Sequence, residues 1–376
     1  MLIDRYIARA QLNAFVIVFV SLAGLTFVVD AFTNMEEFLA HSASGGGLWK
    51  VLGTYYGYRL ISFFDATSPV ISLASAMFAL SWLERHNELT ALLAAGITRW
   101  RIARSAVVFA ALVAGVAAVN REAVLPRIRG AFSRNAQDLR GDKAQPFEAR
   151  YDHATDILFR GRSVQVGLQR IEGPSLLLPQ ALGDLGSQID AEEARWLPAD
   201  DDHPAGYLLS GVREPEGIDL LPPVDIDGRK LVETRSGAAW LEPGQCFVAS
   251  DVTFEQLIGS ANWSQYSSTP ELAAAIANPS LGVGPEIALR VHARVVAPFL
   301  DMTLAMLGIP LVLGPNRRGI FVAVGLCVAM TVLFFLVSLG SHAAAAAAVV
   351  SPSTGAFLPL LVLAPLAAWR AQPMWQ

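Results

Sequence analysis

The sequence predicts an α-helical membrane protein with six transmembrane helices and an inserted all-β, jelly-roll-like domain in the periplasm. Of its 376 residues, 53% are hydrophobic and only 16% are charged, whereas soluble domains carry about 25% charged residues. Apolar runs long enough to cross a bilayer occur three times before and three times after a long polar segment. That segment is acidic and has the pattern of short strands separated by turns.

Six apolar runs approach the length of roughly 20 residues that a helix needs to cross the hydrocarbon core. The first contains one charge, Asp30, and a secretory signal is its rival interpretation. It is long for a signal and no small-x-small cleavage site follows it, so we interpret it as a span. The sixth run is the weakest, because Pro359 and Pro365 interrupt it. The predicted spans are Leu12–Phe32, Ile61–Leu83, Ile102–Asn120, Ala297–Gly314, Gly319–Gly340 and about Ser353–Trp369.

The Lys and Arg residues of the short loops predict the orientation of these spans. One side has nine of them, and the other side has only Lys50 and Arg59. Both termini are therefore expected in the cytoplasm, with the polar segment on the opposite side of the membrane. The nine residues are Arg5, Arg9, Arg85, Arg99, Arg101, Arg104, Arg317, Arg318 and Arg370.

The predicted domains are residues 1–123 with three spans, 124–284 with the β domain, and 285–376 with three spans. The stretch from 124 to 284 holds 14 basic and 23 acidic residues, a net charge of −9, against 14 basic and 10 acidic elsewhere. No basic stripe with interleaved aromatic residues occurs, which argues against nucleic-acid binding. Cys246 and Cys327 fall in different environments, so no disulfide framework is expected.

Short strands with turn signals at this spacing predict a β-sandwich or jelly roll. Asp156–Val166 has the pattern of a hairpin that turns at Gly161. A helix is predicted to begin at Thr269, with its hydroxyl as the cap and a proline in the first position, and to run to about Ala277. Further strands are predicted over Ser175–Leu178, Gly206–Val212 and Cys246–Phe254.

Several catalytic motifs are absent from the sequence. The chain has only three lysines and none follows a glycine, so a P-loop is excluded, and ATP hydrolysis by that route with it. There is no H-E-x-x-H, C-x-x-C or G-x-S-x-G segment. Nothing in the sequence argues for an enzyme, and no cofactor or metal is expected.

The cytoplasmic loop Glu84–Thr98 has the pattern of a short amphipathic helix. Asn87 can cap it, and Gly96 can end it in the left-handed conformation. Such a helix can lie on the lipid surface, or it can sit as a coupling helix in a groove of a cytoplasmic partner. Its apolar face comprises Leu89, Leu92 and Leu93.

This loop, which reads N-E-L-T-A-L-L-A-A-G-I-T from Asn87, resembles the LptF/LptG (YjgP/YjgQ) permeases of the lipopolysaccharide exporter. Arg101-Ile102 and Glu122–Pro126 follow it in the order typical of the family. The remaining similarity covers nearly the whole chain, through Ala194-Arg195-Trp196, Tyr207-Leu208-Leu209, Ser267–Leu272, Arg290–Arg294, Pro298 and Ile309-Pro310.

The resemblance implies six helices with a periplasmic β-jelly roll between the third and fourth. It implies a heterodimer with a paralogous permease subunit, a cytoplasmic ABC ATPase that hydrolyses the nucleotide, and periplasmic jelly-roll bridge proteins. The substrate would be lipopolysaccharide or a related lipid. The residues that this resemblance assigns to the ATPase contact are Glu84, Arg85, Glu88, Leu89, Leu92 and Gly96.

Ionisable residues gather near the predicted outer ends of the spans. They can form a rim that holds a phosphorylated lipid head, for which the Arg fork suits phosphate, or they can be ordinary interfacial anchors and ion pairs. The candidate lipid-binding residues are Arg59, Arg121, Arg290, Arg294, Asp65 and Asp301. Two other functions stay open: an ion-coupled secondary transporter with Asp65 and Asp301 as proton relay, and a membrane sensor with a periplasmic ligand-binding domain.

Overall fold

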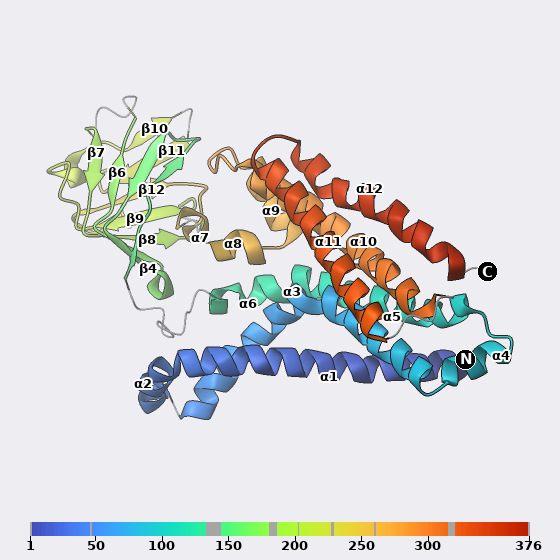
Figure 1. The fold of residues 1–376 in the computed structure, drawn as a ribbon. Coiled ribbons are helices and arrows are strands. Elements are labelled where there is room, and N and C mark those ends of the chain that lie inside the picture. Colours follow the sequence, from blue (N-terminus) through green and yellow to red (C-terminus); the bar gives the residue numbers. More distant parts are fainter. Residues whose placement is uncertain are drawn as a thin grey trace. The chain divides into compact units, whose positions relative to one another are not determined.

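The computed structural model describes residues 2–45, 47–132, 144–179, 186–201, 203–226, 229–258, 261–314 and 320–374. Arg317 and Arg318, two of the arginines used to predict orientation, lie outside these ranges. The chain forms two compact units (Figure 1). The helical unit comprises Met1–Ile128 and Gly284–Gln376, and the β unit comprises Arg129–Val283.

Six helices of the described chain are long and apolar enough to cross a membrane, which confirms the predicted number. Three precede the β unit and three follow it. The third continues through the π-turn η1 (Asn120–Val124) into α6 (Leu125–Phe132). The six helices are α1 (Leu2–Thr33), α3 (Leu48–Arg85), α5 (Arg99–Val119), α10 (Pro285–Leu313), α11 (Ile320–Ala346) and α12 (Pro352–Ala371).

Most of these helices are longer than the apolar runs that predicted them, because no helix breaker separates the runs from their polar flanks. Helix α3 begins at Leu48 rather than near Ile61, and α10 begins at Pro285 rather than near Ala297. Helix α12 continues through both of its prolines. A further helix, α2 (Met35–Gly45), was not predicted.

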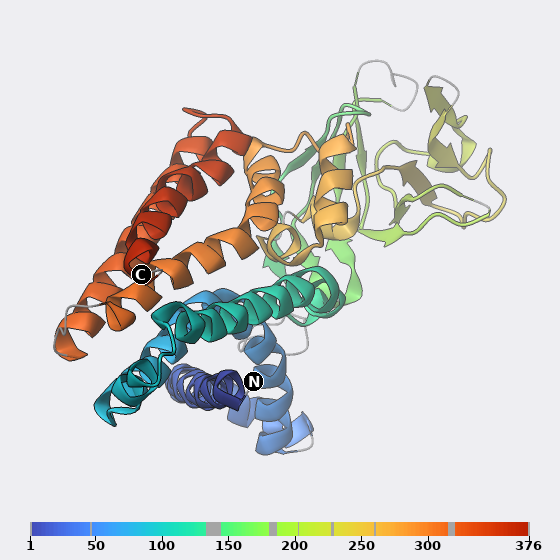
Figure 2. The same cartoon turned by 90° about the vertical axis from the view of Figure 1, so that its right-hand side faces the viewer.

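Helix α10 lies at the centre of the helical unit and packs against α3, α5, α11 and α12 (Figures 1 and 2). Where α10 faces α3, a Cβ on Gly308 would collide with the side chain of Leu73. Small residues at such crossings let membrane helices approach closely. Helix α1, by contrast, buries only 6% of its most apolar stretch in the chain.

The β unit contains two antiparallel sheets. One has the strand order β1-β4-β5-β8-β9-β12-β11-β10, and the other β2-β3-β6-β7. The strands are β1 (Gln145–Pro146), β2 (Arg150–Asp152), β3 (Ile157–Arg160), β4 (Ser163–Gln165), β5 (Arg170–Glu172), β6 (Ser175–Leu177), β7 (Gln188–Asp190), β8 (Glu193–Leu197), β9 (Gly206–Ser210), β10 (Val224–Ile226), β11 (Arg229–Thr234) and β12 (Gln245–Ala249).

Residues from both sheets meet in one hydrophobic core, as in a sandwich. Phe159 of the smaller sheet and Tyr207 of the larger one are fully buried there, with ring centroids 5.2 Å apart. The Tyr207 hydroxyl donates a hydrogen bond to the carbonyl of Val252 at 2.9 Å. Strands β8 and β9, which carry two of the family-like stretches, pair with each other in register from Glu193 to Leu197.

The predicted hairpin over Asp156–Val166 is wrong. Strand β3 pairs with β2 and β6 in the smaller sheet, whereas β4 pairs with β1 and β5 in the larger one. The chain changes sheets at Gly161, where a Cβ would lie 2.6 Å from Cγ2 of Ile171. Alternation alone did not reveal this change, because Phe159 and Val164 enter the same core from opposite sheets.

Three short helices follow β12: α7 (Phe254–Leu257), α8 (Ala261–Tyr266) and α9 (Thr269–Ala277). The strand predicted over Cys246–Phe254 therefore ends too late: β12 stops at Ala249, and Phe254 begins a helix. Helix α9 ends where predicted, but its cap is Ser268 rather than Thr269. The reason is the capping box, in which Ser268 and Glu271 satisfy each other's backbone N–H groups.

Candidate functional site

The predicted cytoplasmic helix exists as α4 (Glu88–Ala94). Gly96 ends it in the left-handed region, with φ of 80°. Asn87 occupies the N-cap position but differs from the prediction, because its φ of 59° is left-handed and its side chain forms no capping hydrogen bond. The turn into the helix thus depends on the backbone conformation that asparagine tolerates.

The leucine face of α4 packs on the chain's own helices. Leu89 is buried in the main core of the helical unit, and the half-buried Leu92 and Leu93 pack against the same core. In the single chain, this face is therefore covered in large part by the chain's own helices. The exposed residues of the segment Glu84–Thr98 are Arg85, His86, Asn87, Thr90, Ala91, Ala94 to Gly96 and Thr98.

Glu88 connects α4 to the first span. Its Oε2 accepts a hydrogen bond from the hydroxyl of Tyr6 at 2.9 Å. Glu84 is half-buried at the end of α3, one turn before α4. The hydrogen bond between Tyr6 and Glu88 could not be predicted from the sequence, because 82 residues separate the two.

A charged network joins α3, η1 and α10. Arg121, in the π-turn, donates from Nε to both carboxylate oxygens of Asp65 at 3.1 and 3.2 Å. The side chain of Asn120 donates to the carbonyl of Ile61 at 3.2 Å and fixes the π-turn on α3. Such single π-turns are frequent at functional sites.

Two further arginines and two carboxylates complete the network. Arg294, with a side chain only 7% exposed, lies 3.7 Å from an oxygen of Glu122. Arg290 interacts electrostatically with Arg294, and Asp301 with both Arg121 and Asp65. In the described part of the chain, Arg290 forms no ion pair. The network thus holds three basic and three acidic residues.

The structure therefore brings five of the six predicted lipid-binding residues together and separates Arg59 from them. The guanidinium of Arg59 lies over the ring of Tyr55, 4.3 Å from its centroid. Beside it, the Tyr56 hydroxyl donates to Asp30 at 2.8 Å. Neither tyrosine was singled out from the sequence, because aromatic residues are common at membrane interfaces and carry no specific signal.

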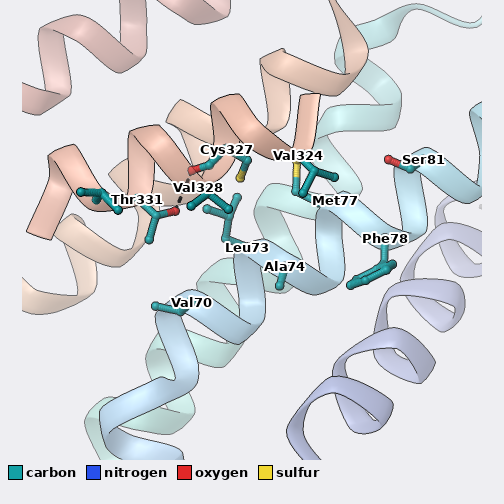
Figure 3. Close-up of a pocket in the computed structure, with 11 residues that line it drawn as sticks. Val70, Leu73, Ala74, Met77, Phe78, Ser81, Val324, Cys327, Val328 and Thr331 are labelled. Atoms are coloured by element: carbon teal, nitrogen blue, oxygen red, sulfur yellow. Dashed lines mark hydrogen bonds between the residues drawn. The ribbon is translucent and has the colours of Figure 1, made fainter. Parts of the chain in front are cut away.

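Apolar grooves open along the spans. One, of about 340 Å³, lies between α3 and α11, with Leu73 and Met77 facing Cys327 and Val328 (Figure 3). Another, of about 410 Å³, ends at the π-turn beside the charged network. Its lining residues are Phe19, Leu60, Ile61, Phe64, Val116, Val119, Asn120 and Val124.

The model of one protein family, described as lipopolysaccharide export system permease LptF/LptG, matches residues 5–213 and 236–372. The chain belongs to the LptF/LptG family. This permease is therefore a multi-pass protein of the bacterial inner membrane with a role in lipopolysaccharide export, as the resemblance implied. Among curated proteins, no individual relative matches the sequence.

The match places both candidate regions of this LptF/LptG permease inside the family model. It covers α4, the π-turn and all of α10, as well as strands β1 to β9. The family consists of permease subunits of an exporter, so the chain is grouped with transporters rather than with enzymes.

Proposed function

We propose that the chain is the permease subunit of an ATP-driven exporter that extracts lipopolysaccharide from the outer leaflet of the inner membrane. A paralogous permease subunit would complete the pathway, and a cytoplasmic ABC ATPase would hydrolyse the nucleotide. The observation that carries this proposal is the family match over both helical regions and most of the β unit.

The ATPase would act on the exposed edge of α4. In this proposal, Glu84, Arg85, Glu88 and Gly96 lie on or beside the contact surface. The leucines Leu89 and Leu92 instead seat the helix on its own core. A push on α4 would then reach α3 directly, because the two helices pack together.

The charged network would hold the lipid head, and the groove beside it would hold an acyl chain. One feature supports this pairing: Asn120 belongs both to the groove and to the π-turn that carries Arg121. The most available cation is Arg290, because Arg121 and Arg294 are occupied by carboxylates. Arg59 would contact lipid separately, from its place over Tyr55.

The β unit would lie in the periplasm, with both termini in the cytoplasm, and would receive the lipid's acyl chains between its sheets. A jelly-roll bridge protein would take the lipid from there. Addition of a strand to the exposed edge of a sheet is one recurring mode of recognition that would allow such a contact.

The family match favours this exporter over the two alternatives. A proton relay through Asp65 and Asp301 would need a carboxyl group free to exchange its proton, whereas Arg121 holds Asp65 by two hydrogen bonds. A sensor would use the same fold, but the family model describes an export permease.

Reversal of one charge on α4 tests the proposal. Glu88→Lys should insert and accumulate, because a carboxylate in the first turn of a helix contributes only about 0.3–1 kcal/mol. It should lose the co-purifying ATPase and lipopolysaccharide export, since a like or unpaired charge at an interface costs several kcal/mol. Glu36→Lys is the matched control, because Glu36 lies exposed in the first turn of α2. Normal ATPase recovery and export by Glu88→Lys would refute the proposed role of α4.

A further inference from the structure

The cytoplasmic end of α1 is fixed to the elements around α4. The Asp4 carboxylate lies 3.6 Å from the guanidinium of Arg104, and the Asp4 carbonyl accepts a hydrogen bond from Ser105 at 3.2 Å. One turn later, Ile7 is 1% exposed in the core of the helical unit. This end of α1 is therefore held in place by the helices around it, although most of α1 is exposed.

Tyr6 lies between these two anchors in the sequence, and its side chain reaches the first turn of α4. The N-terminal end of α1 and α4 lie near each other in Figure 1. Its hydroxyl donates to Oε2 of Glu88 at 2.9 Å. Hydrogen bonds to a charged acceptor are shorter and about twice as strong as those between neutral groups. The bond uses one carboxylate oxygen and leaves Oε1 of Glu88 for another donor.

A glutamate at the surface of a helix is otherwise mobile. Ordering such a side chain in a complex costs conformational entropy. A tyrosine that already holds the carboxylate in one position removes part of this cost before the partner binds.

We infer that Tyr6 is a positioning residue for the ATPase contact: its hydroxyl, held by the anchored end of α1, orients the Glu88 carboxylate on α4 towards the partner. The inference rests on the proposed coupling role of α4. Tyr6 acts only through Glu88, so removal of its hydroxyl has no effect once the Glu88 carboxylate is absent.

A double-mutant cycle on the intact permease complex tests this inference. The affinity of the purified ATPase is measured for complexes that carry Tyr6→Phe, Glu88→Ala or both changes. Tyr6→Phe should weaken binding about fivefold, as expected for one hydrogen bond. Glu88→Ala, which leaves the Tyr6 hydroxyl without its acceptor, should weaken it further, and the double variant should match Glu88→Ala alone. Tyr58→Phe, which removes an exposed hydroxyl on α3, should bind as wild type.

Glu88→Asp provides a second route if Tyr6→Phe fails to accumulate. The shorter side chain keeps the charge but draws the carboxylate away from the Tyr6 hydroxyl, so binding should fall by a similar factor.

Three outcomes separate the claims. Wild-type affinity of Tyr6→Phe beside a weakened Glu88→Ala would overturn the role of Tyr6 and leave the ATPase contact intact. Losses that multiply in the double variant would also overturn it, because Tyr6 would then act by another route. Wild-type affinity of Glu88→Ala would instead count against the proposed contact itself.

Discussion

Arg121 and Asp65 form an ion pair between two membrane helices. Nη2 of Arg121 lies 3.1 Å from Oδ1 of Asp65, in addition to the two hydrogen bonds that Nε donates to the same carboxylate. The two side chains are only 21% and 19% exposed. In lipid, an unpaired charge at this depth is costly, and ionisable residues in spans pair with one another. The pair therefore stabilises the crossing of α3 with the π-turn.

The first prediction is that these two residues are coupled. Asp65→Asn leaves the Arg121 charge without its partner, and Arg121→Gln does the same to Asp65. Each single change should cost about 1–3 kcal/mol, less than a fully buried pair because both side chains keep some exposure. The double change should cost less than the sum of the two. Thermal unfolding of the detergent-solubilised complex measures this, and strictly additive losses would contradict the prediction.

The second prediction compares two arginines one helical turn apart, Arg290 and Arg294, to distinguish a residue that contacts lipid from one that anchors the fold. Arg290 forms no ion pair in the described part of the chain, so Arg290→Gln should lower lipid-stimulated ATPase activity and leave the melting temperature unchanged. Arg294 is buried against Glu122. Arg294→Gln should therefore lower the melting temperature, because it removes this ion pair. If both variants lose assembly alike, the two arginines are anchors only.

The third prediction concerns orientation. Cys246 is fully buried in the β core, which raises the pKa of its thiol to about 12, so a membrane-impermeant thiol reagent should leave it unmodified. Ser187→Cys, at an exposed position of the β unit, should react from the periplasm. Thr90→Cys, exposed on α4, should react only after the inner membrane is opened. The reverse pattern would invert the topology.

The features that could be predicted from the sequence are those set by residues close together along the chain. Spans follow from hydropathy over about 20 residues, and Gly96 and the stop after Ala277 follow from local backbone preferences. Contacts between distant segments were not predictable in this way. Nothing near Tyr6 marks it as a donor to Glu88, and the pairing of Arg121 with Asp65 depends on how a π-turn rotates the chain.

The β unit shows the same limit. Alternating residues identified strands, but not the sheet to which each belongs, and so the chain's crossing at Gly161 was missed. Helix α4 is a related case. Its leucine face was correctly recognised, whereas only the packed helices show that this face is covered by the chain itself.

The last prediction concerns Arg129, the first residue of the β unit, which lies between two carboxylates. Its Nε is 2.9 Å from Glu255 of α7, and its Nη1 is 2.9 Å from Glu271 of α9. Burial alone would raise the pKa of Glu271, but hydrogen bonds from Ser268 and the charge of Arg129 lower it below its ordinary value of 4.5. Glu271 therefore stabilises the folded β unit at neutral pH, and this contribution is lost as the pH falls below 4.5 through the lowered pKa.

Glu271→Gln should remove this pH dependence. Glutamine can still serve in the capping box, so the loss at neutral pH should be about 1 kcal/mol or less. Hydrogen exchange of residues 268–277 in the full chain measures the effect: protection should fall with acid in wild type and stay flat in the variant. Glu216→Gln, at an exposed loop position, should behave as wild type. An unchanged acid response of Glu271→Gln would mean that another carboxylate controls this helix, with Glu255 as the next residue to test because it shares Arg129.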